Sequence, residues 1–491
     1  HVVLDQAVAV GQTVMASALV GGRRLAASIS KWIGRGLPQP QCWPASLALR
    51  HFNTWYQPEA DDHIWLPTEI AEYADMRPTP IPLEEVLEMR LPDEVQAILE
   101  NELPVRLANR IAHLDTLPDL HRSERLTEVR ENFVSSFSDL RKAAKKDATP
   151  DDFAEVIKAM LSRHANQAHC INFGMRRWRE EHHLLDDAKA RSFIDTFLNR
   201  LFLSWIGIET LSSQYLALIA NKGGVVDQTC DPTDVCELAS QTVVDMAKTQ
   251  LKCPPRVEIS YHGPESARTL PLIPSFLYYV VTELLKNSVR AVGELHEATH
   301  CDGVPFPIFL RISSDDNQVA LQIADRGGGI PFERQPRIWS YLYSTAKGSI
   351  VCEHTGVILK PTEAPTPLAG YGVGLPLSRL YAEYIGGTVH IMSMPNFGTN
   401  AYLFLSRSGY HQEALPTYVN WLRKQRLREK LHTLEMQKQN CVEREDFFEA
   451  GRIKTLINEV KLELNSVRSG GHFFNSLEGA PLLRSSIPRK N

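Results

Sequence analysis

A short polar stretch that follows an apolar run carries side chains able to do chemistry. Residues 276–281 are aromatic or aliphatic, and Glu283, Lys286, Asn287 and Arg290 come directly after them. Glu283, Asn287 and Arg290 are spaced i, i+4 and i+7, so in a helix they share one face. An acid, an amide and a cation on one face can accept a proton, bind a metal ion and contact a phosphate. An ordinary amphipathic surface helix is the alternative interpretation.

A second segment places an acid at the end of a predicted strand. The alternation over residues 318–325 predicts a strand with one buried face, and Asp325 is followed by a run of glycines that includes Gly327 and Gly329. Glycine lets the backbone approach a ligand closely. The Asp325 carboxylate can accept a hydrogen bond from an amine such as the exocyclic amine of adenine. A plain turn at the end of a strand would use the same residue types.

A third segment is rich in glycine and leads into a predicted helix. It consists of Gly370, Tyr371, Gly372, Val373, Gly374 and Leu375. Pro376 is favoured in a first helical turn, and the pair Gly386–Gly387 predicts where the helix ends. Glycines at a helix N-terminus form an anion site, because free N–H groups and the helix dipole both face an incoming phosphate. The segment is not a Walker loop, since no Lys-Ser/Thr pair follows the glycines.

The hydrophobic periodicity predicts a helical part followed by a mixed part. Helices are predicted over 93–114, 120–145, 151–168 and 187–220, within a helical region of 55–225. Four helices of this length predict an up-and-down bundle. Within 226–408, strands are predicted at 305–313, 318–325, 388–394 and 399–406. The predicted fold class is therefore α+β, with the bundle followed by an α/β sandwich.

The two ends of the chain differ from this core. Asp5 is the only acid in residues 1–50, which also carry five Lys or Arg residues and many Ala, Ser and Val residues. This composition predicts a mitochondrial or plastid transit segment, with a disordered basic tail as the alternative. Residues 409–467 predict a charged helical extension, and residues 468–491 predict a disordered tail.

Composition sets limits on the class of protein. The chain of 491 residues is 43% hydrophobic, which is enough for two to three domains with real cores. A net charge of -5 gives no sign of a nucleic-acid partner. The eight cysteines form no C-x-x-C pair, so neither a zinc site nor a disulfide framework is predicted, and no apolar run reaches the length of a transmembrane segment.

The three segments in this order resemble the GHKL ATP-binding fold of histidine kinases, Hsp90-type ATPases and mitochondrial protein kinases. Several shorter stretches are similar to the pyruvate dehydrogenase kinases: Glu102–Arg110, Tyr343–Ala346, Pro367–Gly372, Leu375–Ala382 and Gly398–Tyr402. The resemblance extends over roughly residues 55 to 425. A histidine kinase is disfavoured, because no His-Glu/Asp-x-x-x-Pro sequence precedes Glu283.

This resemblance implies a protein serine kinase that uses ATP and Mg²⁺. Glu283 would orient the serine hydroxyl and accept its proton, with Lys286 and Arg290 near the nucleotide, Asn287 on magnesium and Asp325 on adenine. The remaining expected nucleotide contacts are Gly327, Gly329, Ser344, Thr345 and the segment from Gly370 to Leu375. The implied substrate is the pyruvate dehydrogenase alpha subunit, which the kinase would inactivate in the mitochondrial matrix. The implied partners are the lipoyl domain of the dihydrolipoyl acyltransferase core, docked on the bundle, and a second copy in a homodimer.

Two departures from the family pattern keep alternatives open. Pyruvate dehydrogenase kinases commonly carry His four residues before the catalytic Glu, whereas Tyr279 stands here, as in the branched-chain ketoacid dehydrogenase kinase. The Asp-Trp pair that bridges subunits in animal enzymes is absent. Residues 420–466 instead resemble a UVR-type helical hairpin, with a solvated antiparallel hairpin that has no special partner as the alternative. The alternatives are therefore a branched-chain 2-oxoacid dehydrogenase kinase and a weakly active nucleotide-binding regulatory paralogue.

Overall fold

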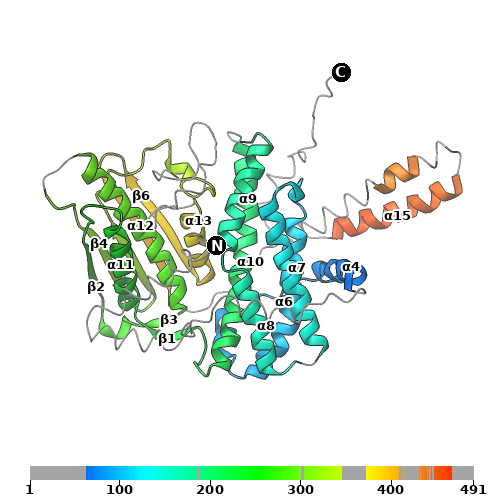
Figure 1. Cartoon of the computed structure of the whole chain (residues 1–491), viewed down its shortest axis with the longest axis horizontal. Helices are drawn as coiled ribbons and strands as arrows, with labels where there is room; N and C mark the ends of the chain where they lie inside the picture. The colour runs from blue at the N-terminus through cyan, green and yellow to red at the C-terminus, as the bar shows by residue number, and fades with distance from the viewer. Residues whose placement is uncertain are drawn as a thin grey trace, which may run out of the picture.

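The computed structural model describes residues 62–146, 148–184, 188–299, 303–344, 372–407, 413, 431, 433–439, 441, 444 and 447–466. Its two main parts lie side by side, a group of long helices and a sheet covered by helices (Figure 1). The predicted α+β fold class, a helical part before a mixed part, is confirmed. The predicted transit segment, the whole segment from Thr345 to Tyr371, and the predicted disordered tail lie outside these residues.

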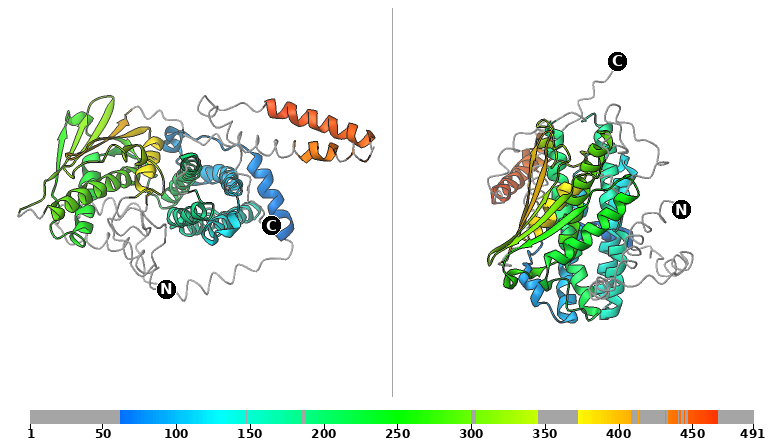
Figure 2. Two further views of the ribbon diagram at one scale, coloured as in Figure 1. Left: turned by 90° about the horizontal axis from the view of Figure 1, so that it is seen from above. Right: turned by 90° about the vertical axis from the view of Figure 1, so that its left-hand side faces the viewer.

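The helical part contains seven helices among the described residues. They are α4 (Asp62–Asp75), α5 (Leu83–Glu88), α6 (Pro92–Leu114), α7 (Glu124–Lys145), α8 (Pro150–Arg163), α9 (Gln167–Glu181) and α10 (Ala188–Ile219). Their buried faces share a core in which Leu99, Phe133, Phe137 and Tyr215 are fully buried. The long helices run roughly alongside one another (Figure 2). An up-and-down bundle of four helices remains a prediction.

The predicted helix over residues 151–168 is wrong in its last turn. The structure ends α8 at Arg163 and begins α9 at Gln167, a helix that the sequence analysis did not predict. Buried His164 stands at this break, with its ring nitrogens 3.0 Å from Ser136 Oγ and 2.7 Å from Gln167 Oε1. Both contacts fix the chain at the corner, and burial lowers the pKa of His164 to about 4.

The mixed part is built on a five-stranded sheet in the order β2-β4-β5-β7-β6. Its strands are β2 (Val257–His262), β4 (Ile308–Ser314), β5 (Gln318–Ala324), β6 (Gly387–Met394) and β7 (Gly398–Ser406). Only the β2–β4 pair is parallel, and the other neighbours are antiparallel. Two short strands, β1 (Asp227–Cys230) and β3 (Leu270–Leu272), form a separate antiparallel pair.

Three helices cover one face of this sheet (Figure 2). They are α11 (Pro232–Lys248), α12 (Pro274–Ala298) and α13 (Gly374–Tyr384). The predicted strands at 305–313, 318–325, 388–394 and 399–406 correspond to β4, β5, β6 and β7, whereas β1, β2 and β3 were not predicted. The alternation that identifies β4 and β5 also occurs in β2, where Val257, Ile259 and Tyr261 pack against the core and Glu258 and His262 are exposed.

The C-terminal extension is helical at most of the residues that the structure describes there. Helix α15 (Phe447–Ser466) projects from the body together with a helical segment at 433–439 (Figure 1). Val460 of α15 packs against Leu431 and Leu434, and Lys461 Nζ lies 3.2 Å from Glu435 Oε1. A resemblance to UVR-type hairpins remains a prediction. Among the described residues, no helix is long and apolar enough to cross a membrane.

Glu413, which follows β7, anchors the chain to the helical part. Its carboxylate lies 2.6 Å and 2.8 Å from the two terminal nitrogens of Arg106 on α6 and accepts the Ile81 N–H at 3.0 Å. The hydroxyl of Tyr384 on α13 donates to the same carboxylate at 3.3 Å. Arg106 also pairs with Glu102 at 2.9 Å. Arg106 is 0% exposed and Glu413 is 6% exposed, so this ion pair is shielded from water.

Replacing Glu413 with alanine should lower the free energy of unfolding by about 3 kcal/mol, because it leaves a buried arginine without one of its two carboxylates. Urea unfolding followed by circular dichroism measures this loss. The matched control is Glu383→Ala, which breaks an exposed pair with Arg379 at 3.0 Å and should cost less than about 1 kcal/mol. Equal losses in the two variants would contradict a special role for Glu413.

Candidate functional site

Helix α12 forms the floor of the candidate site. Pro274 stands in its first turn, where proline is tolerated, and its apolar face packs into the core through Leu277, Val281, Leu285 and Val289. The polar face is half-buried and carries the side chains that the sequence analysis singled out: Glu283, Lys286, Asn287 and Arg290. The spacing therefore places these groups on one face, as predicted.

Three of these four side chains are engaged in ion pairs and one, that of Asn287, is open. Lys286 Nζ lies 2.8 Å from Glu283 Oε1, and Arg290 Nε lies 3.9 Å from Glu294 Oε1. Burial lowers the pKa of Arg290 from its ordinary value, opposed by Glu294 and Glu283. Within the part of the chain that the structure describes, the Asn287 amide makes no hydrogen bond and remains accessible. An amide oxygen that has no partner can serve a ligand.

Asp325 lies at the end of β5 beside the middle of α12. The Ser288 hydroxyl donates to Asp325 Oδ2 at 2.8 Å. The N–H groups of Gly327 and Thr399 donate to Oδ1 at 2.9 Å and 3.2 Å. Burial raises the pKa of the Asp325 carboxyl, and these three hydrogen bonds oppose that rise. Oδ1 is therefore occupied by two protein donors, while Oδ2 keeps room for one more.

The start of α13 lies against the other end of the polar face. A β-carbon at residue 374 would collide with Glu283 Oε2, so a side chain at this position would displace the carboxylate from the α13 N-terminus. Gly386 has a φ of 74° and ends the helix, as predicted. Glu283 and the contact of Gly327 with Ala291 are eight residues apart along α12, about 12 Å. An extended nucleoside triphosphate can cover that distance.

The structure brings most of the predicted site residues together around α12. Glu283, Lys286, Asn287, Arg290, Asp325 and Gly327 line its polar face or touch it, and Gly374 adjoins Glu283. Gly329 lies further along the turn, with its α-carbon against the Met394 carbonyl of β6. Ser344, Gly372, Val373 and Leu375 are half-buried near the α13 N-terminus. Thr345, Gly370 and Tyr371 lie outside the described residues.

Some residues beside the site were not predicted. Ser288 and Thr399 hold the Asp325 carboxylate; Ser288 has no sequence signal beyond its position next to Asn287, whereas Thr399 lies in the family-like stretch Gly398–Tyr402 but was given no role. Tyr279, one turn before Glu283, packs its ring 4.7 Å from that of Tyr381, whose hydroxyl donates to Glu209 Oε2 at 3.5 Å. Burial and then the nearby Glu283 raise the pKa of Tyr279. Among the described residues, Tyr279 makes no hydrogen bond to Glu283.

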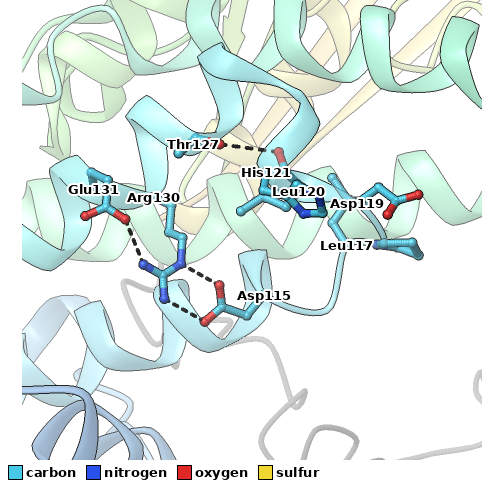
Figure 3. A pocket seen from close by; sticks show the side chains of 9 residues that line it. Asp115, Leu117, Asp119, Leu120, His121, Thr127, Arg130 and Glu131 are labelled. Atoms are coloured by element: carbon cyan, nitrogen blue, oxygen red, sulfur yellow. Dashed lines mark hydrogen bonds and ion pairs between the residues drawn. The ribbon is translucent and has the colours of Figure 1, made fainter.

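A separate hollow of about 630 Å³ lies in the helical part, between the end of α6 and the start of α7 (Figure 3). Its one arginine, Arg130, is already bound by Asp115 at 2.6 Å and 3.1 Å and by Glu131 at 2.9 Å. The guanidinium charge is therefore neutralised from two sides. This hollow offers no free cation to an anionic ligand, and it does not include α12.

Family models match both the helical part and the mixed part of the chain. A family model described as mitochondrial branched-chain alpha-ketoacid dehydrogenase kinase matches residues 88–235. A second model, described as histidine kinase-, DNA gyrase B- and HSP90-like ATPase, matches residues 273–409. The second match contains α12, Asp325 and α13, and the first contains most of the helical part.

Curated relatives match across both parts. The chain is 36% identical over 328 residues to a mitochondrial pyruvate dehydrogenase (acetyl-transferring) kinase of Arabidopsis thaliana, covering 65% of this chain and 86% of that protein. It is 32% identical over 366 residues to the Drosophila melanogaster kinase of the same name, covering 70% and 86%. It is 29% identical over 374 residues to isozyme 3 of Homo sapiens, covering 72% and 89%.

Proposed function

The chain belongs to the mitochondrial pyruvate dehydrogenase kinase family, and we propose that it transfers the γ-phosphate of ATP to a serine of the pyruvate dehydrogenase alpha subunit, inactivating that complex. The observation that carries this proposal is that Asp325 and the N-terminus of α13 both lie against the polar face of α12. Its polar face runs from Glu283, beside the α13 N-terminus, to Ser288, which binds Asp325. This arrangement supports a nucleotide with adenine at one end and its terminal phosphate at the other.

Glu283 acts as the general base in this proposal. Its Oε1 is held by Lys286, whereas Oε2 faces the start of α13. Oε2 takes the proton of the serine hydroxyl as the serine oxygen bonds to the γ-phosphorus. The bond from that phosphorus to the β–γ bridging oxygen breaks, and ADP leaves. Lys286 keeps the carboxylate oriented and adds positive charge near the phosphates. Positioning and charge account for most of such catalysis.

The nucleotide is held at three places. The Asp325 Oδ2 accepts the exocyclic amine of adenine. The N–H groups of Gly374 and Leu375, which begin α13 and have no helical acceptor, point to the phosphates, with Arg290 adding charge. Gly327, Gly329, Ser344, Thr345, Gly370, Tyr371, Gly372 and Val373 complete the proposed contacts.

Asn287 is the proposed protein ligand of Mg²⁺. Magnesium prefers oxygen ligands and is often held by one or two protein groups together with substrate phosphates. The open amide of Asn287 fits this role, and no cluster of three or more acidic, His or Cys side chains occurs in the described part of the chain. A magnesium ion held by Asn287 would supply positive charge against that of the phosphates.

The proposed partners follow from the family. The helical part, residues 55–225, docks the lipoyl domain of the dihydrolipoyl acyltransferase core in the mitochondrial matrix. A second copy binds through the sheet face that the helices leave uncovered. On that face the rings of Tyr402 and Phe404 stack at 6.1 Å, and Met392 is 64% exposed, which supports an apolar contact.

Incubation with labelled ATP and purified dehydrogenases tests the proposed function. The expected result is label on serine of the pyruvate dehydrogenase alpha subunit, located by phosphosite mapping. Transfer should increase when the acyltransferase core with its lipoyl domains is present, and the kinase should sediment as a dimer. Label on the branched-chain dehydrogenase alone would contradict the pyruvate assignment. Absence of label on both would favour a regulatory paralogue.

A branched-chain 2-oxoacid dehydrogenase kinase is the second candidate. Tyr279 stands where that enzyme also carries Tyr, and the family model that matches residues 88–235 bears its name. The relatives that match over both parts of the chain are named pyruvate dehydrogenase kinases, which favours the first candidate.

A further inference from the structure

Helix α10 of the helical part contacts the mixed part directly beside the candidate site. The Tyr341 N–H donates to Asp195 Oδ1 at 2.8 Å, and the Tyr341 hydroxyl donates to Asn199 Oδ1 at 2.9 Å. The ring of Phe202 stacks on that of Tyr341 with centroids 5.6 Å apart. Asp195, Asn199 and Phe202 all lie on α10, so one helix holds both the backbone and the side chain of Tyr341.

The residue after Tyr341 connects this contact to the glycine segment. Leu342 donates its N–H to the Gly372 carbonyl at 2.9 Å. Leu342 has a φ of 64° and is 4% exposed, a backbone conformation that costs free energy and persists only where neighbours enforce it. Gly372 has a φ of 75°, and a β-carbon there would lie 2.7 Å from the Tyr343 carbonyl oxygen. Leu342 and Gly372 therefore hold each other in backbone conformations with positive φ.

The contacts continue to the catalytic carboxylate. Gly374 follows Gly372 by two residues and lies against Glu283 Oε2. A displacement of Tyr341 would move Leu342, then Gly372, and so the N–H groups at the start of α13. The connection from α10 to the proposed base thus runs through packed backbone with short hydrogen bonds.

We infer that Asp195 and Asn199 are positioning residues that act from the helical part: by holding Tyr341 they set the place of Gly372–Gly374 relative to Glu283 and the nucleotide phosphates. The inference rests on the proposed function, since it assigns a role within that same site. The hydrogen bond from Tyr381 to Glu209 also joins α10 to the mixed part, but its length is 3.5 Å. The hydrogen bonds of Tyr341 to Asp195 and Asn199 are shorter, at 2.8 Å and 2.9 Å, so they make the tighter connection.

Charge is consistent with this role for Asp195. Burial raises the pKa of its carboxyl, and the hydrogen bonds from the Ser340 side chain and the Tyr341 backbone, together with the charge of Arg191, act in the opposite direction. A carboxylate that accepts two donors from consecutive residues fixes their backbone more firmly than a single contact does.

The test measures ATP affinity by calorimetry and the thermal unfolding midpoint for the same variants. Tyr341→Phe and Asn199→Leu each remove the hydroxyl contact and should weaken ATP binding about fivefold. The double variant should bind no more weakly than either single variant, because both remove one interaction. Asn199→Asp keeps an acceptor and should restore the wild-type affinity. Asn199 is exposed, so its replacement leaves the core intact.

Tyr215→Phe is the matched control. Tyr215 also lies on α10 and loses hydroxyl bonds to Gln96 at 3.1 Å and Pro150 at 2.8 Å, all inside the helical part. It should lower the unfolding midpoint without changing ATP affinity. Equal ATP affinity in wild type, Tyr341→Phe and Asn199→Leu would overturn the inference and leave the proposed function standing. A wild-type chain that binds no ATP would overturn both.

Discussion

Replacing Glu283 with glutamine should slow phosphoryl transfer by at least about a hundredfold while leaving ATP affinity within about twofold of wild type. Glutamine keeps the size of the side chain and its place beside Gly374, but it cannot take the serine proton. It also loses the charge that pairs with Lys286 at 2.8 Å. Because the nucleotide contacts lie mostly elsewhere on α12 and α13, binding should survive the change.

Single-turnover transfer with ATP already bound separates chemistry from binding in this variant. The matched control is Glu294→Gln, which changes an acid on the same helix whose carboxylate lies 3.9 Å from Arg290. Glu294 is further from the start of α13, so its replacement should reduce the transfer rate by less than about fivefold. Wild-type transfer rates in Glu283→Gln would show that another group accepts the proton.

Replacing Asp325 should abolish ATP binding, and asparagine makes the more informative variant than alanine. In wild type, the N–H groups of Gly327 and Thr399 both donate to Oδ1. An amide at residue 325 must turn its oxygen toward these two donors, which leaves its NH₂ group facing Ser288 and the ligand. That donor would meet the amine of adenine, another donor. We expect ATP affinity to fall at least about a hundredfold, as when a buried polar group meets the wrong partner.

Calorimetry with ATP measures this loss, and two further variants identify its cause. Asp325→Ala should also abolish binding, but it removes the support of Gly327 and Thr399 as well. Ser288→Ala removes only the donor to Oδ2 at 2.8 Å and should leave ATP affinity within about fivefold of wild type. Unchanged affinity in Asp325→Asn would refute the assignment of Asp325 to adenine.

The sequence predicted those parts of the site that depend on local periodicity. The spacing of Glu283, Asn287 and Arg290 fixes a common face once the segment is helical, and the glycine segment with Pro376 marks the start of α13. Alternation in residues 318–324 likewise placed Asp325 at the end of a strand. Each of these inferences uses residues only a few positions apart. The local sequence was therefore enough to predict where these side chains lie on their helix or strand.

Contacts between distant segments were not predictable in this way. Asp195 meets Tyr341 across 146 positions, and no pattern near either residue indicates the other. Helix α9 was missed because the break at His164 is fixed by Ser136 on another helix. The role of Gly374 cannot be read from its neighbours in sequence either, since the carboxylate that a side chain at residue 374 would displace belongs to Glu283.

The ion pair between Arg106 and Glu413 has a consequence for the order in which the molecule is completed. The partners are 307 positions apart, and chains are synthesised from the N-terminus. The helices around Arg106 therefore emerge long before the carboxylate that balances its charge, with only Glu102 to pair it in the meantime. The helical part is synthesised before the sheet, yet the charge of its Arg106 is fully paired only after every strand of the sheet has been made.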